Sequence, residues 1–100
     1  MNEALKTKIL NNKFVELLRT ETVIDQNEYQ PLCEALKDLA KAWKGASSID
    51  KVLMQDLYVL PQIAKNVAES LVEHQPEMAQ KIEEMAMELD ALVLDCLSAS

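Results

Sequence analysis

The sequence has very few of the residues that phosphate-binding loops and tight turns require. Glycine occurs once, proline three times, and aromatic residues make up 4% of the 100 residues. A single glycine excludes the glycine-rich loops that allow a backbone to approach a nucleotide phosphate. The sequence also has no arrangement of serine, histidine and acid typical of a nucleophilic enzyme. We therefore predict no catalytic residues, no bound cofactor and no enzymatic activity.

Clustered basic residues and long apolar runs are lacking as well. Arg19 is the only arginine, and the lysines are scattered along the chain. Proteins that bind nucleic acid or an anionic membrane gather Lys and Arg on one surface. No apolar run approaches the roughly 20 residues of a membrane span, and the N-terminal apolar run is too short for a signal peptide. We expect a cytoplasmic protein that binds neither nucleic acid nor membranes.

Metal ligands and reactive thiols are few. His74 is the only histidine, and Cys33 and Cys96 lie far apart without a CxxC spacing. Zinc and di-iron sites need three or four convergent ligands, so we predict no metal site and a surface position for His74. Both cysteines fall on apolar helix faces, where a reduced thiol acts as a small hydrophobic group. We expect them to be reduced residues of the core.

One alternative function is an enzyme that uses carboxylates and magnesium. Glu69 and Glu73 are four residues apart, as are Glu84 and Glu88, so each pair shares a helix face. Together with Asp95 they supply the oxygen ligands that Mg²⁺ prefers. The alternative is therefore a small all-helical nucleotide pyrophosphohydrolase, although the tandem acidic motifs typical of such enzymes do not occur here.

Apolar and charged residues are abundant. They make up 49% and 27% of the chain, which is the composition of one soluble globular domain covering residues 1–100. With so few turn-forming residues, the chain is predicted to be all-α and to form an antiparallel up-and-down four-helix bundle. The predicted helices cover residues 2–20, 25–45, 47–72 and 76–97.

Local signals mark the two middle helices. Asp25 and Glu28 have the spacing of a capping box at the start of the second helix, and Gly45 is placed to end it. Trp43 is predicted to anchor the core from this helix. In the third helix the apolar stripe continues through Pro61, which removes one backbone hydrogen bond. We therefore predict one helix that is kinked at Pro61 rather than two helices.

The last helix combines a regular apolar seam with the acidic surplus of the protein. Its inward-facing residues are spaced by four, three, four, three and four: Met78, Ile82, Met85, Leu89, Leu92 and Cys96. Residues 1–65 hold nine acids and nine bases, whereas residues 66–100 hold eight acids and one base, so the net charge of -7 lies in the last third. Such a surface is typical of a solvated face, or alternatively of a docking face for a basic partner.

Several apolar residues lie away from the stripe that each helix supplies to the core. A monomeric bundle needs about one apolar stripe per helix, so a second group of apolar residues predicts an exposed patch. We predict that this patch forms an interface with another chain. Its residues are Leu5, Ile9, Met54, Tyr58, Val72, Met87 and Leu94.

These features favour a small acidic protein-interaction module or regulator, of the adaptor or inhibitor type. We expect it to form a homodimer and to bind another protein that offers a basic or apolar surface. Scattered exposed apolar residues are also normal in monomers, which is one alternative for the predicted patch. A small apolar ligand held between the helices is another.

Overall fold

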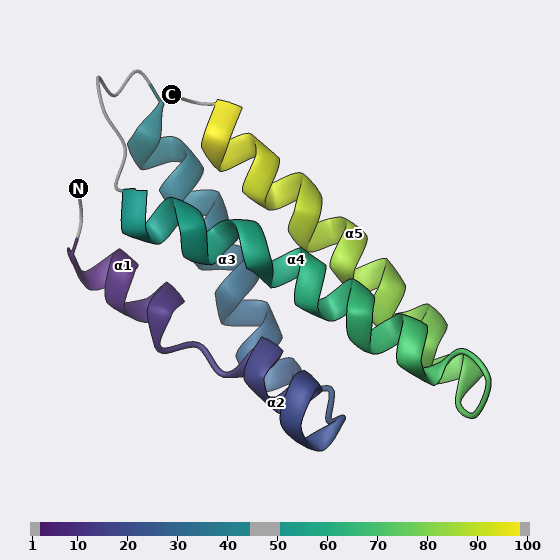
Figure 1. The fold of residues 1–100 in the computed structure, drawn as a ribbon. Coiled ribbons are helices and arrows are strands. Elements are labelled where there is room, and N and C mark those ends of the chain that lie inside the picture. Colours follow the sequence, from purple (N-terminus) through teal and green to yellow (C-terminus); the bar gives the residue numbers. More distant parts are fainter. Residues whose placement is uncertain (1–2, 45–50, 99–100) are drawn as a thin grey trace.

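The computed structural model describes residues 3–44 and 51–98 of the chain. These residues form five helices and no strand (Figure 1): α1 (Glu3–Leu10), α2 (Phe14–Glu21), α3 (Gln26–Trp43), α4 (Lys51–Leu71) and α5 (Pro76–Ser98). The prediction of an all-α chain is confirmed. Among these described helices, none combines the length and the apolar character needed to cross a membrane.

The prediction of a single helix over residues 2–20 is wrong, because the chain leaves the helical conformation between α1 and α2. The side chain of Asn12 accepts a hydrogen bond from the backbone N–H of Phe14 at 3.0 Å and donates one to the carbonyl oxygen of Glu28 at 2.8 Å. The backbone N–H of Lys13 donates to Glu28 Oε1 at 2.8 Å. Asparagine competes in this way with helical hydrogen bonds, so the chain leaves the helix and is tied to the first turn of α3.

The interruption also overturns the predicted interface role of Leu5 and Ile9. Both are buried in the core, whereas Leu10 is exposed. A helical wheel drawn from residue 2 to 20 assumes one unbroken helix, but the turn angle of 100° per residue does not continue across the break. α1 is therefore free to present Leu5 and Ile9 to the core, against α3 and α4.

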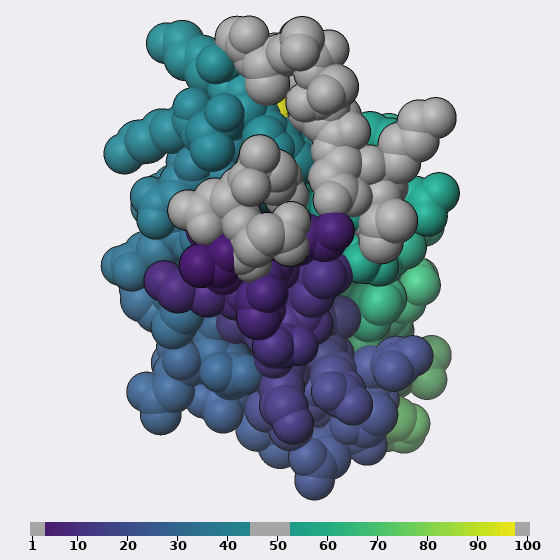
Figure 2. Space-filling view, turned by 90° about the vertical axis from the view of Figure 1, so that its left-hand side faces the viewer, coloured from purple at the N-terminus to yellow at the C-terminus, as the bar shows by residue number. Residues whose placement is uncertain are grey.

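The remaining helices pack around the α4–α5 hairpin. α4 and α5 lie side by side and are joined by a short turn at residues 72–75 (Figure 1). α5 also packs on α3, while α1 and α2 both contact α3 and α4. Within the described ranges, no pair of Cα atoms from α3 and α4 lies within 8 Å. Figure 2 shows α1 and α2 along the middle of one face of the molecule, between α3 on one side and α4 on the other.

The core confirms most of the predicted apolar stripes. Trp43 is buried at the end of α3, and α4 is one helix through Pro61. On α5, Met78 and Leu92 are partly buried and the other four seam residues are buried. Both cysteines are free and buried, as predicted. The largest side chains that are inaccessible to solvent are Phe14, Leu18, Leu32, Leu36, Leu39, Leu53, Leu57, Ile82 and Leu89.

The helix-end predictions have mixed outcomes. The Asp25 side chain accepts a hydrogen bond from the Asn27 N–H at 2.9 Å and so caps α3, as predicted. Glu28 does not reach back toward Asp25 but binds the Lys13 backbone, so it secures the break between α1 and α2. Gly45 lies outside the described residues, and Lys44 is the C-cap of α3.

Candidate docking groove on the α4–α5 hairpin

Four of the seven predicted interface residues lie on the outer side of the α4–α5 hairpin. Tyr58 comes from α4, Val72 directly follows α4 at the start of the turn, and Met87 and Leu94 come from α5. Their side chains are between 55 and 64% exposed, which is far more than a core residue of the same size. Met54 on α4 is only half-buried. The structure therefore brings together Tyr58, Val72, Met87 and Leu94, without Leu5, Ile9 and Met54.

The spacing along the helices explains why these side chains share one side of the hairpin. Tyr58 and Val72 are separated by two steps of seven residues with Lys65 between them, and Met87 and Leu94 are seven residues apart. Seven residues make nearly two turns, so residues at this spacing stay on the same helix face. Because α4 and α5 run in opposite directions, Tyr58 lies near Leu94 and Val72 lies near Met87.

Two hollows follow one another along the hairpin, and we refer to them together as the α4–α5 groove. The larger has a volume of about 240 Å³ and is lined by Tyr58, Pro61, Gln62, Lys65, Asp90, Val93, Leu94 and Leu97. The smaller has a volume of about 140 Å³ and is lined by Lys65, Ala68, Glu69, Val72, Glu83 and Met87. Lys65 lines both hollows, so they adjoin at this residue.

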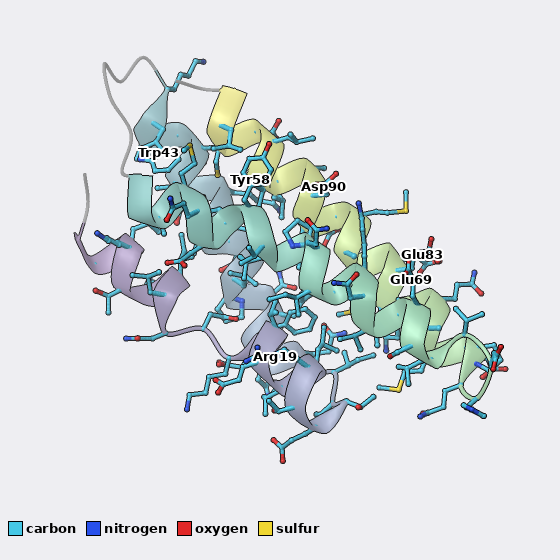
Figure 3. The ribbon with its side chains drawn as sticks, viewed as in Figure 1. Arg19, Trp43, Tyr58, Glu69, Glu83 and Asp90 are labelled. Carbon is cyan, nitrogen blue, oxygen red and sulfur yellow. The ribbon has the colours of Figure 1, made fainter. Side chains whose placement is uncertain are left out.

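The charged residues of the groove are mostly acidic. Glu69, Glu83 and Asp90 contribute three carboxylates, against the single ammonium group of Lys65. Figure 3 shows Glu69 and Glu83 beside each other on the half of the hairpin nearer the turn, and Tyr58 and Asp90 on the other half. The groove therefore combines exposed apolar side chains with a surplus of two negative charges.

The seven predicted interface residues do not include the charged members of the groove. Lys65 lies midway between Tyr58 and Val72, and Asp90 lies between Met87 and Leu94. On α5, five groove residues recur at steps of four, three, four and three, which makes a second heptad stripe beside the core seam: Glu83, Met87, Asp90, Leu94 and Leu97. The spacing of this stripe is present in the sequence, but a pattern of apolar residues alone does not reveal it because two of its members are charged.

The carboxylates of the proposed magnesium site are divided between two sides of α5. Glu69 shares the groove with Glu83, whereas Glu84 and Glu88 line a separate hollow together with Tyr29 of α3. In the described part of the chain, no three His, Cys, Asp or Glu side chains are placed to hold one metal ion. The spacing that suggested a shared site therefore brings these pairs to different surfaces.

A partly buried polar contact between α3 and α5 lacks the features of a nucleophilic centre. The hydroxyl of Tyr29 donates a hydrogen bond to Glu88 Oε1, and the thiol of Cys33 donates to the same oxygen at 3.6 Å. Burial is the main cause that raises the pKa of both Tyr29 and Cys33. Burial also raises the pKa of Cys96 to about 11. These groups stay protonated at neutral pH, so neither thiol is activated for attack.

The chemistry that the groove offers is non-covalent binding. It has apolar side chains that lose contact with water when covered, and carboxylates that attract a cationic group. In comparisons with known proteins, the chain matches no protein-family model, no curated protein and no solved structure.

Proposed function

We propose that the chain is a small protein-interaction module, of the adaptor or inhibitor type, that docks another protein in the α4–α5 groove. The observation that carries the proposal is the gathering of four exposed apolar side chains along two adjoining hollows. Single exposed apolar residues are normal in monomers, but a contiguous patch beside polar residues is typical of an interaction surface. The free thiols of Cys33 and Cys96 favour action in the reducing cytoplasm.

The side chains in the groove suit this role. Tyr58 offers a rigid aromatic ring with a polar hydroxyl, a residue type that is enriched among interface anchors. Met87 is unbranched and polarizable, so it adapts to the shape of a partner. A groove between two helices is also the geometry in which many proteins receive an amphipathic helix.

A homodimer is one form of this proposal. A second copy of the chain would offer the same apolar side chains, and packing one hairpin on another would make a four-helix interface. It would also bring together two groove surfaces that each carry an excess of acid, which opposes the association. Self-association is therefore measured alongside the binding of other proteins.

Two features of the scaffold belong to the same proposal. We infer an antiparallel up-and-down four-helix bundle. In this bundle α1 and α2 together take the place of the first helix, because both contact α3 and α4. We also infer a bend in α4 at Pro61, which has no N–H to donate to the carbonyl of Leu57. Such a bend would shape the larger hollow, which Pro61 lines.

The proposal is tested with substitutions that place an acid inside or outside the groove. Tyr58→Asp and Met87→Glu charge the groove, whereas Val23→Glu charges an exposed apolar residue between α2 and α3. Light scattering at micromolar concentration reports self-association, and affinity capture from an extract of the source cells reports other partners. We expect the wild type and Val23→Glu to bind the same protein and both groove variants to lose it. Groove variants that bind as the wild type does would contradict the proposal.

A further inference from the structure

We propose that the α4–α5 groove receives one amphipathic helix with basic flanks, supplied by a partner protein, in preference to a second copy of this chain. This inference rests on the proposed function and specifies the chemistry of the partner. Its basis is the combination of groove length, the heptad spacing of the apolar side chains and the sign of the charges beside them.

The dimensions of the groove fit a helix of about four turns. Tyr58 on α4 and Val72, the residue directly after α4, mark its two ends and are 14 residues apart, a distance of about 21 Å along a helix. Apolar side chains at steps of three and four on the partner helix would meet the pair Tyr58 and Leu94 in one hollow and the pair Val72 and Met87 in the other. A peptide that binds by adding a strand to a sheet would need a free strand edge, and no strand occurs in residues 3–44 or 51–98.

The charges of the groove select a basic partner. Glu69 and Glu83 line the smaller hollow from opposite helices, and Asp90 lines the larger one. They are part of a region, residues 66–100, that holds eight acids against one base. Lys or Arg on both flanks of the partner helix would face these carboxylates while its apolar stripe fills the hollows. Complementary charge of this kind speeds association and excludes partners of the same sign.

A second copy meets the same conditions less well. Each copy has a net charge of -7, so two copies repel each other before they make contact. Within the groove, each copy would bring three carboxylates and only one lysine. Like charges brought into an interface cost binding free energy, so the groove is better suited to a cationic helix than to its own surface.

The inference is tested by calorimetric titration of the full chain with synthetic helices. The probe is an amphipathic peptide of about 16 residues, roughly 24 Å long as a helix, with leucines at steps of three and four and lysines on its flanks. A second peptide carries glutamates in place of the lysines, and a third has the lysine and leucine positions scrambled so that it has no apolar stripe. We expect micromolar binding of the basic amphipathic peptide, binding at least about tenfold weaker for the other two, and loss of affinity with added salt.

Charge-reversal variants of the protein locate the binding. Asp90→Lys places a cation in the groove, and Glu34→Lys makes the same change on the exposed surface of α3. We expect Asp90→Lys to lower the affinity for the basic peptide about five- to tenfold. Glu34→Lys should change this affinity less than about twofold. Leu94→Ala keeps all charges and is expected to lower the affinity for the basic peptide about as much as Asp90→Lys does.

The outcomes separate this inference from the proposed function. The basic helix is not the occupant if the protein binds none of the peptides or binds all three with equal affinity. Equal effects of Asp90→Lys and Glu34→Lys would also overturn it. If the basic peptide fails and the wild type forms a dimer that Met87→Glu disrupts, the groove is still a docking surface and its occupant is a second copy. If the peptide fails and no groove-dependent binding is found, both proposals are wrong.

Discussion

The hydroxyl of Tyr29 on α3 donates a hydrogen bond to Glu88 Oε1 on α5, with 2.5 Å between the two oxygens. The ring of Tyr29 is buried and packs at a tilt against Phe14 of α2, with 4.7 Å between the ring centroids. One side chain thus connects three helices. Because α5 carries half of the groove, this contact also helps to hold the groove in place.

Replacing Tyr29 by phenylalanine removes the hydroxyl and keeps the ring. We expect Tyr29→Phe to lower the free energy of unfolding by about 1–2 kcal/mol, because the lost hydrogen bond has a charged acceptor. Urea denaturation measures the change, and Tyr58→Phe is the matched control because Tyr58 is exposed. The same small effect in both variants would show that the hydrogen bond from Tyr29 to Glu88 does not contribute to the free energy of unfolding.

The link between α1 and α2 gives a second prediction. Asn12→Ala removes the hydrogen bond that the side chain donates to the Glu28 carbonyl and the one that it accepts from the Phe14 N–H. We expect the substitution to cost about 1–2 kcal/mol of unfolding free energy. Asn11→Ala changes the neighbouring exposed asparagine and is expected to cost less than about 0.5 kcal/mol. Thermal unfolding of both variants measures the difference. Equal stability of the two would indicate that the link is held by other contacts.

Burial predicts which of the seven expected interface residues support the fold. Ile9→Ala removes a side chain buried in the core and is expected to cost about 2–5 kcal/mol of unfolding free energy. Met87→Ala shortens an exposed side chain and is expected to change stability by less than about 0.5 kcal/mol. Guanidinium denaturation measures both. A large loss for Met87→Ala and a small one for Ile9→Ala would contradict the structure.

The buried thiols predict a fall in stability at alkaline pH. Burial raises the pKa of Cys96 from 9.0 to about 11, so between these values the unfolded chain loses a proton that the folded chain keeps. The stabilisation is complete below about pH 9 and is lost as the pH rises from about 9 to about 11, a change on the order of 2–3 kcal/mol. The raised pKa values of Tyr29 and Cys33 act in the same direction.

Urea denaturation of the wild type and of Cys96→Ala at a series of pH values isolates this effect. The variant starts less stable because it leaves a cavity, but its stability should fall less steeply above pH 9. In parallel, both thiols should react slowly with a thiol reagent in the folded state and fast after unfolding. Identical pH slopes for the two proteins would contradict the raised pKa of Cys96.

Sequence reasoning succeeded where local spacing determines structure. The seam of α5 and the burial of Trp43 follow from helical periodicity, and Asp25 caps α3 because a carboxylate can accept the free N–H groups there. These features depend on residues within a few positions of each other. Their physical causes are therefore visible in a single sequence.

The break after α1 depends instead on residues distant in sequence. Asn12 and Lys13 are held by Glu28, which is 16 and 15 residues away, and periodicity alone cannot show that contact. Leu5 and Ile9 were misplaced for this reason. Periodicity placed Tyr58, Val72, Met87 and Leu94 away from the core, and all four are exposed. That they lie together depends on the packing of α4 against α5.

The central claim is that the α4–α5 groove is the docking surface, and amide chemical-shift mapping tests it most directly. The isotope-labelled full chain is titrated with the basic amphipathic peptide, and shift changes are assigned along the sequence. We predict the largest changes at Tyr58, Lys65, Met87, Asp90 and Leu94, with little change at exposed residues of α3 such as Glu34 and Lys37. Changes centred on α1, α2 or α3, with the groove residues unaffected, would contradict the claim.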